Sequence, residues 1–92
     1  MKIVINTYHD GGFSLSDAAL ALYNKLSGKS LRYCWDIERD DPFLVKVVET
    51  LGKKANGRFA RLKVVDIPED VDWQIEEYDG LEWVAEMHRT WC

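Results

Sequence analysis

The chain has 92 residues, of which 47% are hydrophobic and 30% charged, and its formal net charge is −4 at neutral pH. This length and this balance predict one globular domain spanning residues 1–92, and they exclude a disordered or collagen-like chain. The mildly acidic total is unlike the basic excess of a typical nucleic-acid-binding domain.

The N-terminal residues are typical of a strand and not of a signal peptide. MKIVINTYHD has neither a long apolar stretch nor a small-residue cleavage site. No apolar run approaches the roughly 20 residues that cross a bilayer. The two cysteines, Cys34 and Cys92, are far apart and form no CxxC or His-paired spacing. We therefore expect an intracellular protein with reduced thiols, and a disulfide is the alternative.

The first half of the chain predicts a strand and two helices. Residues 2–7 are β-branched and apolar, as in a strand. Ser14, with Asp17 three residues later, resembles a capping box and predicts a helix over residues 15–27, which Gly28 ends. Residues 31–35 are too short to distinguish an extended connection from an edge strand. Asp41 as N-cap and Pro42 at the first helical position start a second amphipathic helix, which stops at residues 56–57.

The second half predicts three strands. Residues 60–67 form the first, and Pro68 ends it. Residues 72–78 and 81–86 form the other two, because Asp79-Gly80 between them is typical of a two-residue type I′ turn. We expect Trp73 and Trp83 to face the core or each other across this hairpin. Trp91 either packs on the sheet or is exposed as an anchor for a partner.

These elements together predict an α+β fold. The last three strands would form an antiparallel meander, and the N-terminal strand would add to it. The result is an approximately four-stranded, mainly antiparallel sheet with the two helices on one face.

Charge is distributed unevenly along the chain. Residues 50–63 contain five basic side chains and no acidic one, and we name these five the basic block: Lys53, Lys54, Arg58, Arg61 and Lys63. Such a cluster suits phosphate groups or an acidic protein surface, and Phe59 within it is suited to stacking on a base. The alternative is that acidic residues of the same chain neutralise these cations.

The acidic counterpart follows directly. Residues 66–86 contain nine carboxylates and no basic side chain, and we name this range the acidic segment. The candidates for a partner-binding acidic face are Asp70, Asp72, Glu76, Glu77 and Glu82. An ordinary solvated face is the alternative, and acid–base chemistry by Glu76 and Glu82 paired across the hairpin is a remoter one.

The loop before the first helix is the third candidate site, formed by His9, Asp10, Gly11 and Gly12. Glycine-rich entries to helices bind phosphates, but this loop has neither the GxxxxGK[ST] nor the GxGxxG spacing, so a simple strand-to-helix turn is the alternative. His9 and His88 stand in no metal-ligand spacing. The sequence predicts no catalytic residue, no metal and no cofactor.

Several stretches resemble a family of small, uncharacterised phage and prophage proteins. They are MKIVIN, GGFSLS, ERDDP followed by LV and VVE, LGKKANGRFARLKVVDIPEDV, IEEYDG and VAEMHRTW. The resemblance implies a phage setting and no transferable activity. A compact acidic phage protein of this size is similar in type to anti-CRISPR proteins, in particular inhibitors of the type I-F surveillance complex.

The resemblance therefore implies a non-enzymatic inhibitor that binds a CRISPR-Cas surveillance complex in the host cytoplasm and blocks target DNA binding. Its partners would be Cas proteins and guide RNA, without membrane contact and without strong binding to bare duplex DNA. The alternatives are a small nucleic-acid-binding accessory protein that uses the basic block with Phe59, and a nucleotide-sequestering protein that uses the loop at residues 9–14.

Overall fold

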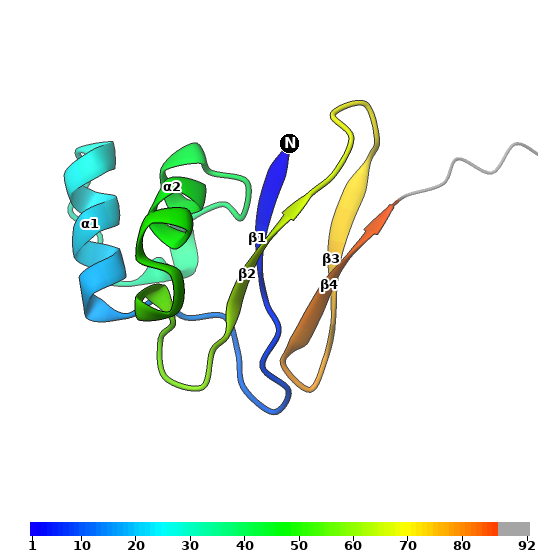
Figure 1. The fold of residues 1–92 in the computed structure, drawn as a ribbon, viewed down its shortest axis with the longest axis horizontal. Coiled ribbons are helices and arrows are strands. Elements are labelled where there is room, and N and C mark those ends of the chain that lie inside the picture. Colours follow the sequence, from blue (N-terminus) through cyan, green and yellow to red (C-terminus); the bar gives the residue numbers. More distant parts are fainter. Residues whose placement is uncertain (87–92) are drawn as a thin grey trace, which may run out of the picture.

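Two α-helices and four antiparallel strands make up the part of the chain that the computed structural model describes, residues 1–86 (Figure 1). Strands β1 and β2 pair with Lys2 opposite Asp66, and β3 and β4 pair with Trp73 opposite Glu86. The elements are β1 (Lys2–Asn6), α1 (Asp17–Ser27), the 3-10 helix η1 (Cys34–Asp36), α2 (Pro42–Leu51), the 3-10 helix η2 (Gly52–Ala55), β2 (Leu62–Asp66), β3 (Trp73–Tyr78) and β4 (Leu81–Glu86).

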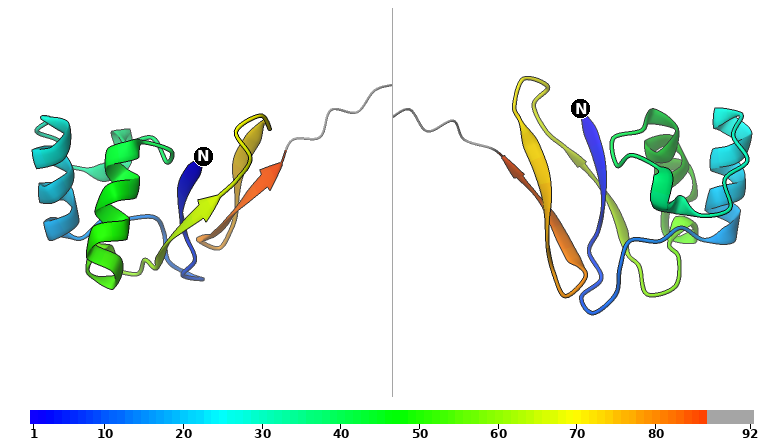
Figure 2. Two further views of the ribbon diagram at one scale, coloured as in Figure 1. Left: turned by 45° about the horizontal axis from the view of Figure 1, so that its top comes forward. Right: turned by 180° about the vertical axis from the view of Figure 1, so that it is seen from behind.

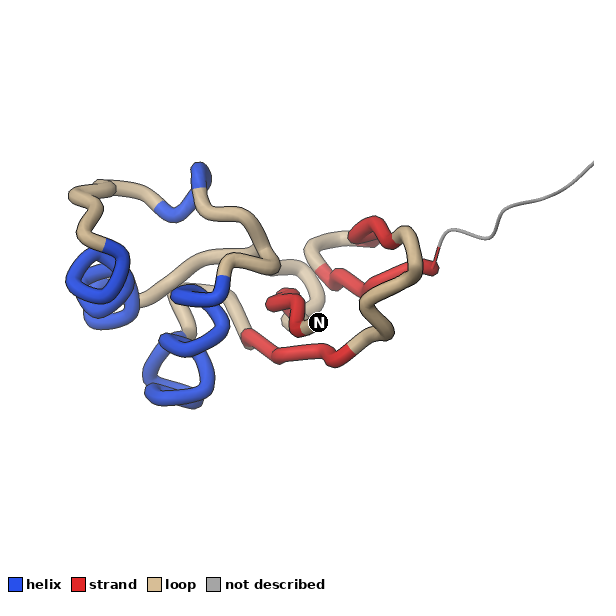
Figure 3. The backbone as a smooth tube through the Cα atoms, turned by 90° about the horizontal axis from the view of Figure 1, so that it is seen from above, coloured by secondary structure: helices blue, strands red, loops and turns tan. Residues whose placement is uncertain are grey.

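The pair β1–β2 lies between the helices and the β3–β4 hairpin (Figures 1 and 3). On the helical side, Val4 and Val64 belong to a core with residues of α1 and α2. On the other side, Ile3 and Ile5 form a second, smaller core with Trp73 and other residues of the hairpin. Figure 2 shows the same order of layers from two further directions.

The expected α+β class is confirmed, but the single four-stranded sheet is wrong, because the strands form two separate two-stranded sheets. β2 pairs with β1 and not with β3, so the predicted meander is absent. The physical reason lies in β1, where Ile3, Val4 and Ile5 are all buried. A strand that is apolar on both faces needs cover on both faces, and the hairpin supplies the second cover.

Local signals fix most element ends as expected. Gly28 ends α1 with φ 76°, and Asp41 caps α2 by accepting hydrogen bonds from the Phe43 and Leu44 amides. Asp79 and Gly80 both have positive φ, as a type I′ turn requires. The N-cap of α1 is Ser16 and not Ser14, since the Ser16 hydroxyl accepts from the Ala19 amide.

Three further expectations meet different outcomes. The segment at residues 31–35 is not an edge strand: it leads into the 3-10 helix η1, Cys34–Asp36, where Cys34 is buried. Trp73 packs on the second core, but Trp83 lies on the opposite, solvent-facing side of the hairpin, 42% exposed. The expectations for His88, Trp91 and Cys92 fall outside the described residues. Among residues 1–86, no helix has the length and the apolar character that crossing a bilayer requires.

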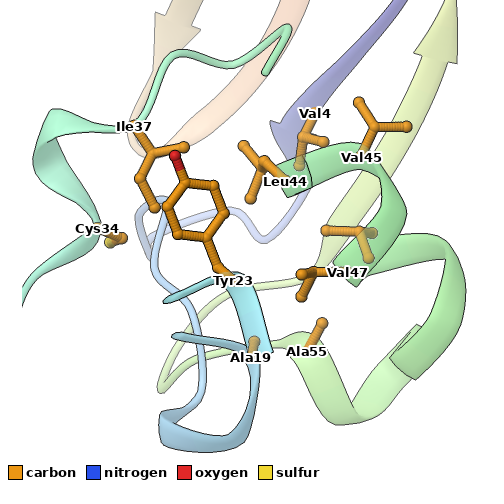
Figure 4. Packing of buried hydrophobic residues seen from close by; sticks show 10 residues of the cluster. Val4, Ala19, Tyr23, Cys34, Ile37, Leu44, Val45, Val47 and Ala55 are labelled. Carbon is orange, nitrogen blue, oxygen red and sulfur yellow. The ribbon is translucent and has the colours of Figure 1, made fainter. Parts of the chain in front are cut away.

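Tyr23 is the largest fully buried side chain and lies at the centre of the helical core (Figure 4). Its hydroxyl donates to the Asp41 Oδ2 atom at 2.7 Å, so one phenol joins α1 to the N-cap of α2. Burial of the ring raises the pKa of Tyr23 to about 12, and the neighbouring Asp41 carboxylate acts in the same direction.

This raised pKa predicts a loss of stability in alkali. A group whose folded-state pKa lies above the unfolded value of 10.0 keeps its full contribution below that pH and loses it as the pH rises toward about 12. We expect the urea midpoint of the wild-type protein to decrease as the pH rises from 10.0 to about 12, and that of Tyr23→Phe to decrease less. Tyr33→Phe, which changes an exposed tyrosine, is the control and should retain the wild-type slope. Equal slopes in all three proteins would contradict the prediction.

Candidate functional site

The basic block is exposed along its whole length. Lys53 and Lys54 lie on η2, Arg58 and Arg61 lie in the following loop, and Lys63 lies near the start of β2. No salt bridge joins any of these five side chains to another residue of the described range 1–86. The alternative of internal neutralisation therefore finds no ion pair to support it, and the five cations are available to an external anion.

Two exposed aromatic rings accompany these cations. Tyr8 and Phe59 are 37% and 57% exposed, and their ring centroids are 6.4 Å apart with the planes tilted by 58°. The guanidinium of Arg58 lies 5.1 Å from the Phe59 centroid, and that of Arg61 lies 5.9 Å from the Tyr8 centroid. We name these four residues the aromatic–arginine cluster. A shallow depression beside it is lined by Thr7, Tyr8, His9 and Arg61.

Sequence reasoning found Phe59 and both arginines but missed Tyr8. Tyr8 follows β1, and it reaches the loop before β2 because the strands are antiparallel neighbours: the Thr7 amide donates to the Arg61 carbonyl at 2.7 Å. A prediction that paired β1 with β2 would have brought Tyr8 beside Arg61.

The loop at residues 9–12 is folded against two other loops. The amide of Asp10 donates to the Asp79 carbonyl, that of Gly11 to the Tyr8 carbonyl and that of Gly12 to the Phe59 carbonyl. Because each of these three amides already donates a hydrogen bond within the protein, none of them is free to bind a phosphate. The interpretation of the glycines as a structural turn is the one that this geometry favours.

His9 remains exposed and lies between two carboxylates. Its Nδ1 atom is 3.3 Å from Asp10 Oδ2 and its Nε2 atom 3.9 Å from Asp79 Oδ2, and its ring stacks on Tyr78. The side-chain atoms of His9, Asp10 and Asp79 that could ligate a metal ion lie within 4.8 Å of one another, although all three side chains are exposed. This juxtaposition depends on the hairpin turn and was not predictable from the spacing of the histidines.

Four of the five candidate acidic residues, Asp70, Asp72, Glu76 and Glu77, are exposed. Glu76 accepts a hydrogen bond from the Trp83 indole N–H at 3.1 Å, which holds the exposed indole on the outer face of the hairpin. Because Glu77 and not Glu76 lies opposite Glu82, the expected cross-strand pair of Glu76 and Glu82 is not formed.

Glu82 corrects the prediction of an exposed acidic face. Its side chain is only 6% exposed, and Arg39 binds it with two parallel hydrogen bonds of 2.6 and 2.8 Å. The Oε1 atom also accepts from the Asn6 amide at 2.7 Å. A carboxylate leaves water only when such partners replace its hydration, so Glu82 serves the fold and is not available to a partner.

Asn6 and Arg39 complete this buried network, and neither was predicted to be important. Asn6 is fully buried, and its side chain donates to the carbonyls of Tyr8 and Gly80 and accepts from the amides of Tyr8 and Arg61. The Arg39 guanidinium lies 3.7 Å from the centroid of Phe13. The network fastens the hairpin, the loop at residues 9–14 and the loop before α2 to the end of β1.

No family model, curated protein or solved structure matches this chain.

Proposed function

We propose that this chain is a phage-encoded, non-enzymatic inhibitor that binds a host CRISPR-Cas surveillance complex in the cytoplasm and blocks target DNA binding. The observation that carries the proposal is the presence of two exposed groups of opposite charge on one small domain. The basic block precedes and begins β2, and the acidic residues start at Asp66, where β2 ends. In Figure 1 the loop at residues 67–72, which bears three of these carboxylates, lies at the end of β2 opposite to the loop that precedes β2, and the β3–β4 hairpin bears most of the others.

Such a surface matches a nucleoprotein, which presents both phosphates and cationic grooves. The exposed carboxylates of the acidic segment would occupy a basic groove that otherwise holds DNA, and complementary charge would speed the encounter. The basic block would contact guide RNA or an acidic patch of a Cas subunit. Bare duplex DNA should bind weakly, because the eight exposed carboxylates of residues 66–86 repel its phosphates.

Charge reversal of Asp72 and Glu76 to Lys tests the acidic contact. We expect weaker binding to the purified surveillance complex, mainly through an association rate about tenfold slower at low salt, since exposed charges act chiefly on encounter. The measurement is surface plasmon resonance of both proteins on the immobilised complex over a salt series.

The matched control reverses Asp36 and Glu38 to Lys, which changes the net charge by the same amount outside the acidic segment. Both of these side chains are exposed. If the control slows association as much as Asp72→Lys with Glu76→Lys, only net charge matters and the specific acidic face is refuted. If the wild-type protein binds no such complex, the inhibitor proposal fails.

The aromatic–arginine cluster favours a second candidate, a small nucleic-acid-binding accessory protein. Exposed rings next to guanidinium groups that form no salt bridge within residues 1–86 are the components that single-strand-binding surfaces use. Tight binding of the isolated protein to naked nucleic acid, with no binding to a surveillance complex, would decide for this candidate. A nucleotide-sequestering role gains no support, since the amides of the loop at residues 10–12 are already bonded.

A further inference from the structure

We infer that the aromatic–arginine cluster is a stacking site for an unpaired base of single-stranded nucleic acid, with the adjoining phosphates held by Arg58 and Arg61. The inference deepens the proposed function, on which it rests, because it assigns the contact with guide RNA to these residues. The observation that carries it is the placement of two solvent-exposed rings, each with its own guanidinium, on two loops that the β1–β2 pairing brings together.

The exposure of Phe59 is built into the backbone. Phe59 has φ 59°, a left-handed conformation that costs a residue with a side chain about 1 kcal/mol or more. The loop is nevertheless fixed in this state, because the Phe59 carbonyl accepts from the Gly12 amide at 3.1 Å and the Ala60 amide donates to the Gly57 carbonyl. The ring is thus presented to solvent by a closed loop, where burial would have been the ordinary outcome for phenylalanine.

The two guanidinium groups favour an anionic ligand, and the two exposed rings favour one with an aromatic face. Neither guanidinium has a salt-bridge partner within residues 1–86, so each is free to bind a phosphate oxygen. A base that stacks on Phe59 or Tyr8 contributes about 1–3 kcal/mol. Bases inside a duplex have no free face, and therefore the cluster should prefer single strands.

Neighbouring carboxylates limit the length of the site. Asp10 and Asp79 flank His9 at the edge of the depression that Tyr8 and Arg61 line. A phosphate backbone that continued past His9 would meet these two negative charges. Nucleotides beyond the stacked base should accordingly lie on the side of the cluster that faces away from Asp10 and Asp79.

The test is fluorescence anisotropy of the isolated protein with labelled oligonucleotides about ten nucleotides long, a length that one small domain covers. Single-stranded RNA, single-stranded DNA and the matched duplex are compared between about 50 and 200 mM salt. We expect weak, salt-sensitive binding to single strands and at least about tenfold weaker binding to the duplex. A preference between the RNA and DNA arms identifies which strand the site takes.

Variants separate stacking from charge. Phe59→Ala should weaken single-strand binding at least about fivefold, whereas Phe59→Tyr, which retains a π face, should bind as the wild type does. Arg58→Gln with Arg61→Gln should flatten the salt dependence. Phe43→Ala removes a phenylalanine that is also exposed, at 42%, but lies on α2, and it should have no effect. Thermal melts of every variant show that it is folded.

Three outcomes would overturn the inference: no binding of single strands, equal binding of single strands and duplex, or unchanged affinity in Phe59→Ala. None of these bears on docking to a surveillance complex through the acidic segment. Conversely, single-strand binding that depends on Phe59 together with no binding to such a complex would refute the proposed function and leave the stacking site standing.

Discussion

Replacement of Glu82 by Gln is expected to lower the free energy of unfolding by about 3 kcal/mol, as breaking a buried ion pair does. The amide removes the charge that balances Arg39, and its NH₂ group cannot accept the second guanidinium hydrogen bond. A small domain has only about 5–15 kcal/mol in total, so the loss should be plain in urea denaturation.

Glu77→Gln is the matched control, because Glu77 lies directly opposite Glu82 in the hairpin but is exposed. Its effect should stay within about 0.5 kcal/mol. The double variant Arg39→Met with Glu82→Gln should lose less than Glu82→Gln alone, since no unpaired charge remains buried and the amide oxygen introduced at position 82 can still accept from the Asn6 amide. Equal stabilities of Glu82→Gln and Glu77→Gln would contradict the buried position of Glu82.

The network also explains how the hairpin is attached. β4 does not extend the β1–β2 sheet. Instead, the Glu82 carboxylate accepts the Asn6 amide hydrogen bond that a neighbouring strand would otherwise accept, and the Arg39 carbonyl accepts the Val4 amide in the same way. A side chain and a loop thus supply the acceptors for the Asn6 and Val4 amides of β1, so neither amide needs a third strand beside it.

What the sequence predicts well is local. The caps at Gly28 and Asp41 and the turn at Asp79-Gly80 depend on residues next to one another, and the structure has each of them. The pairing of β2 depends on residues about 60 positions apart, for which periodicity gives no register. One signal was present in the sequence: the three consecutive apolar residues Ile3, Val4 and Ile5 are typical of a strand covered on both faces.

The candidate sites divide in the same way. Runs of like charge predict exposure correctly for the basic block, because lysine and arginine without a partner stay in water. The same reasoning fails for Glu82, whose partner Arg39 lies 43 residues earlier in the chain. Tyr8 is absent from any sequence pattern with Phe59, and only the antiparallel pairing of β1 and β2 brings the two rings together.

A side chain at Gly80 is expected to destabilise the protein, because the hairpin turn packs closely on the loop at residues 9–12, which is bonded to the loop that contains Phe59. Gly80 is buried with φ 88°, and a Cβ atom there would lie 2.0 Å from the Gly11 carbonyl oxygen. The obstacle is backbone, and the loop that contains it is bonded to the Phe59 loop, because the Gly12 amide donates to the Phe59 carbonyl at 3.1 Å. The Gly80 carbonyl also accepts from Asn6 Nδ2 at 2.7 Å, so displacing the turn disturbs the buried network.

Gly80→Val is therefore expected to cost about 2–4 kcal/mol, of which about 1–2 kcal/mol is the left-handed backbone and the rest overpacking. Gly28→Val is the control that separates the two causes, because Gly28 has φ 76° but nothing within 4 Å of its added Cβ. Urea denaturation of both variants and the wild type gives the comparison. The excess of Gly80→Val over Gly28→Val measures the contact between the hairpin turn and Gly11. If the two variants lose equal stability, the Gly80 turn does not pack on the loop that contains Gly11.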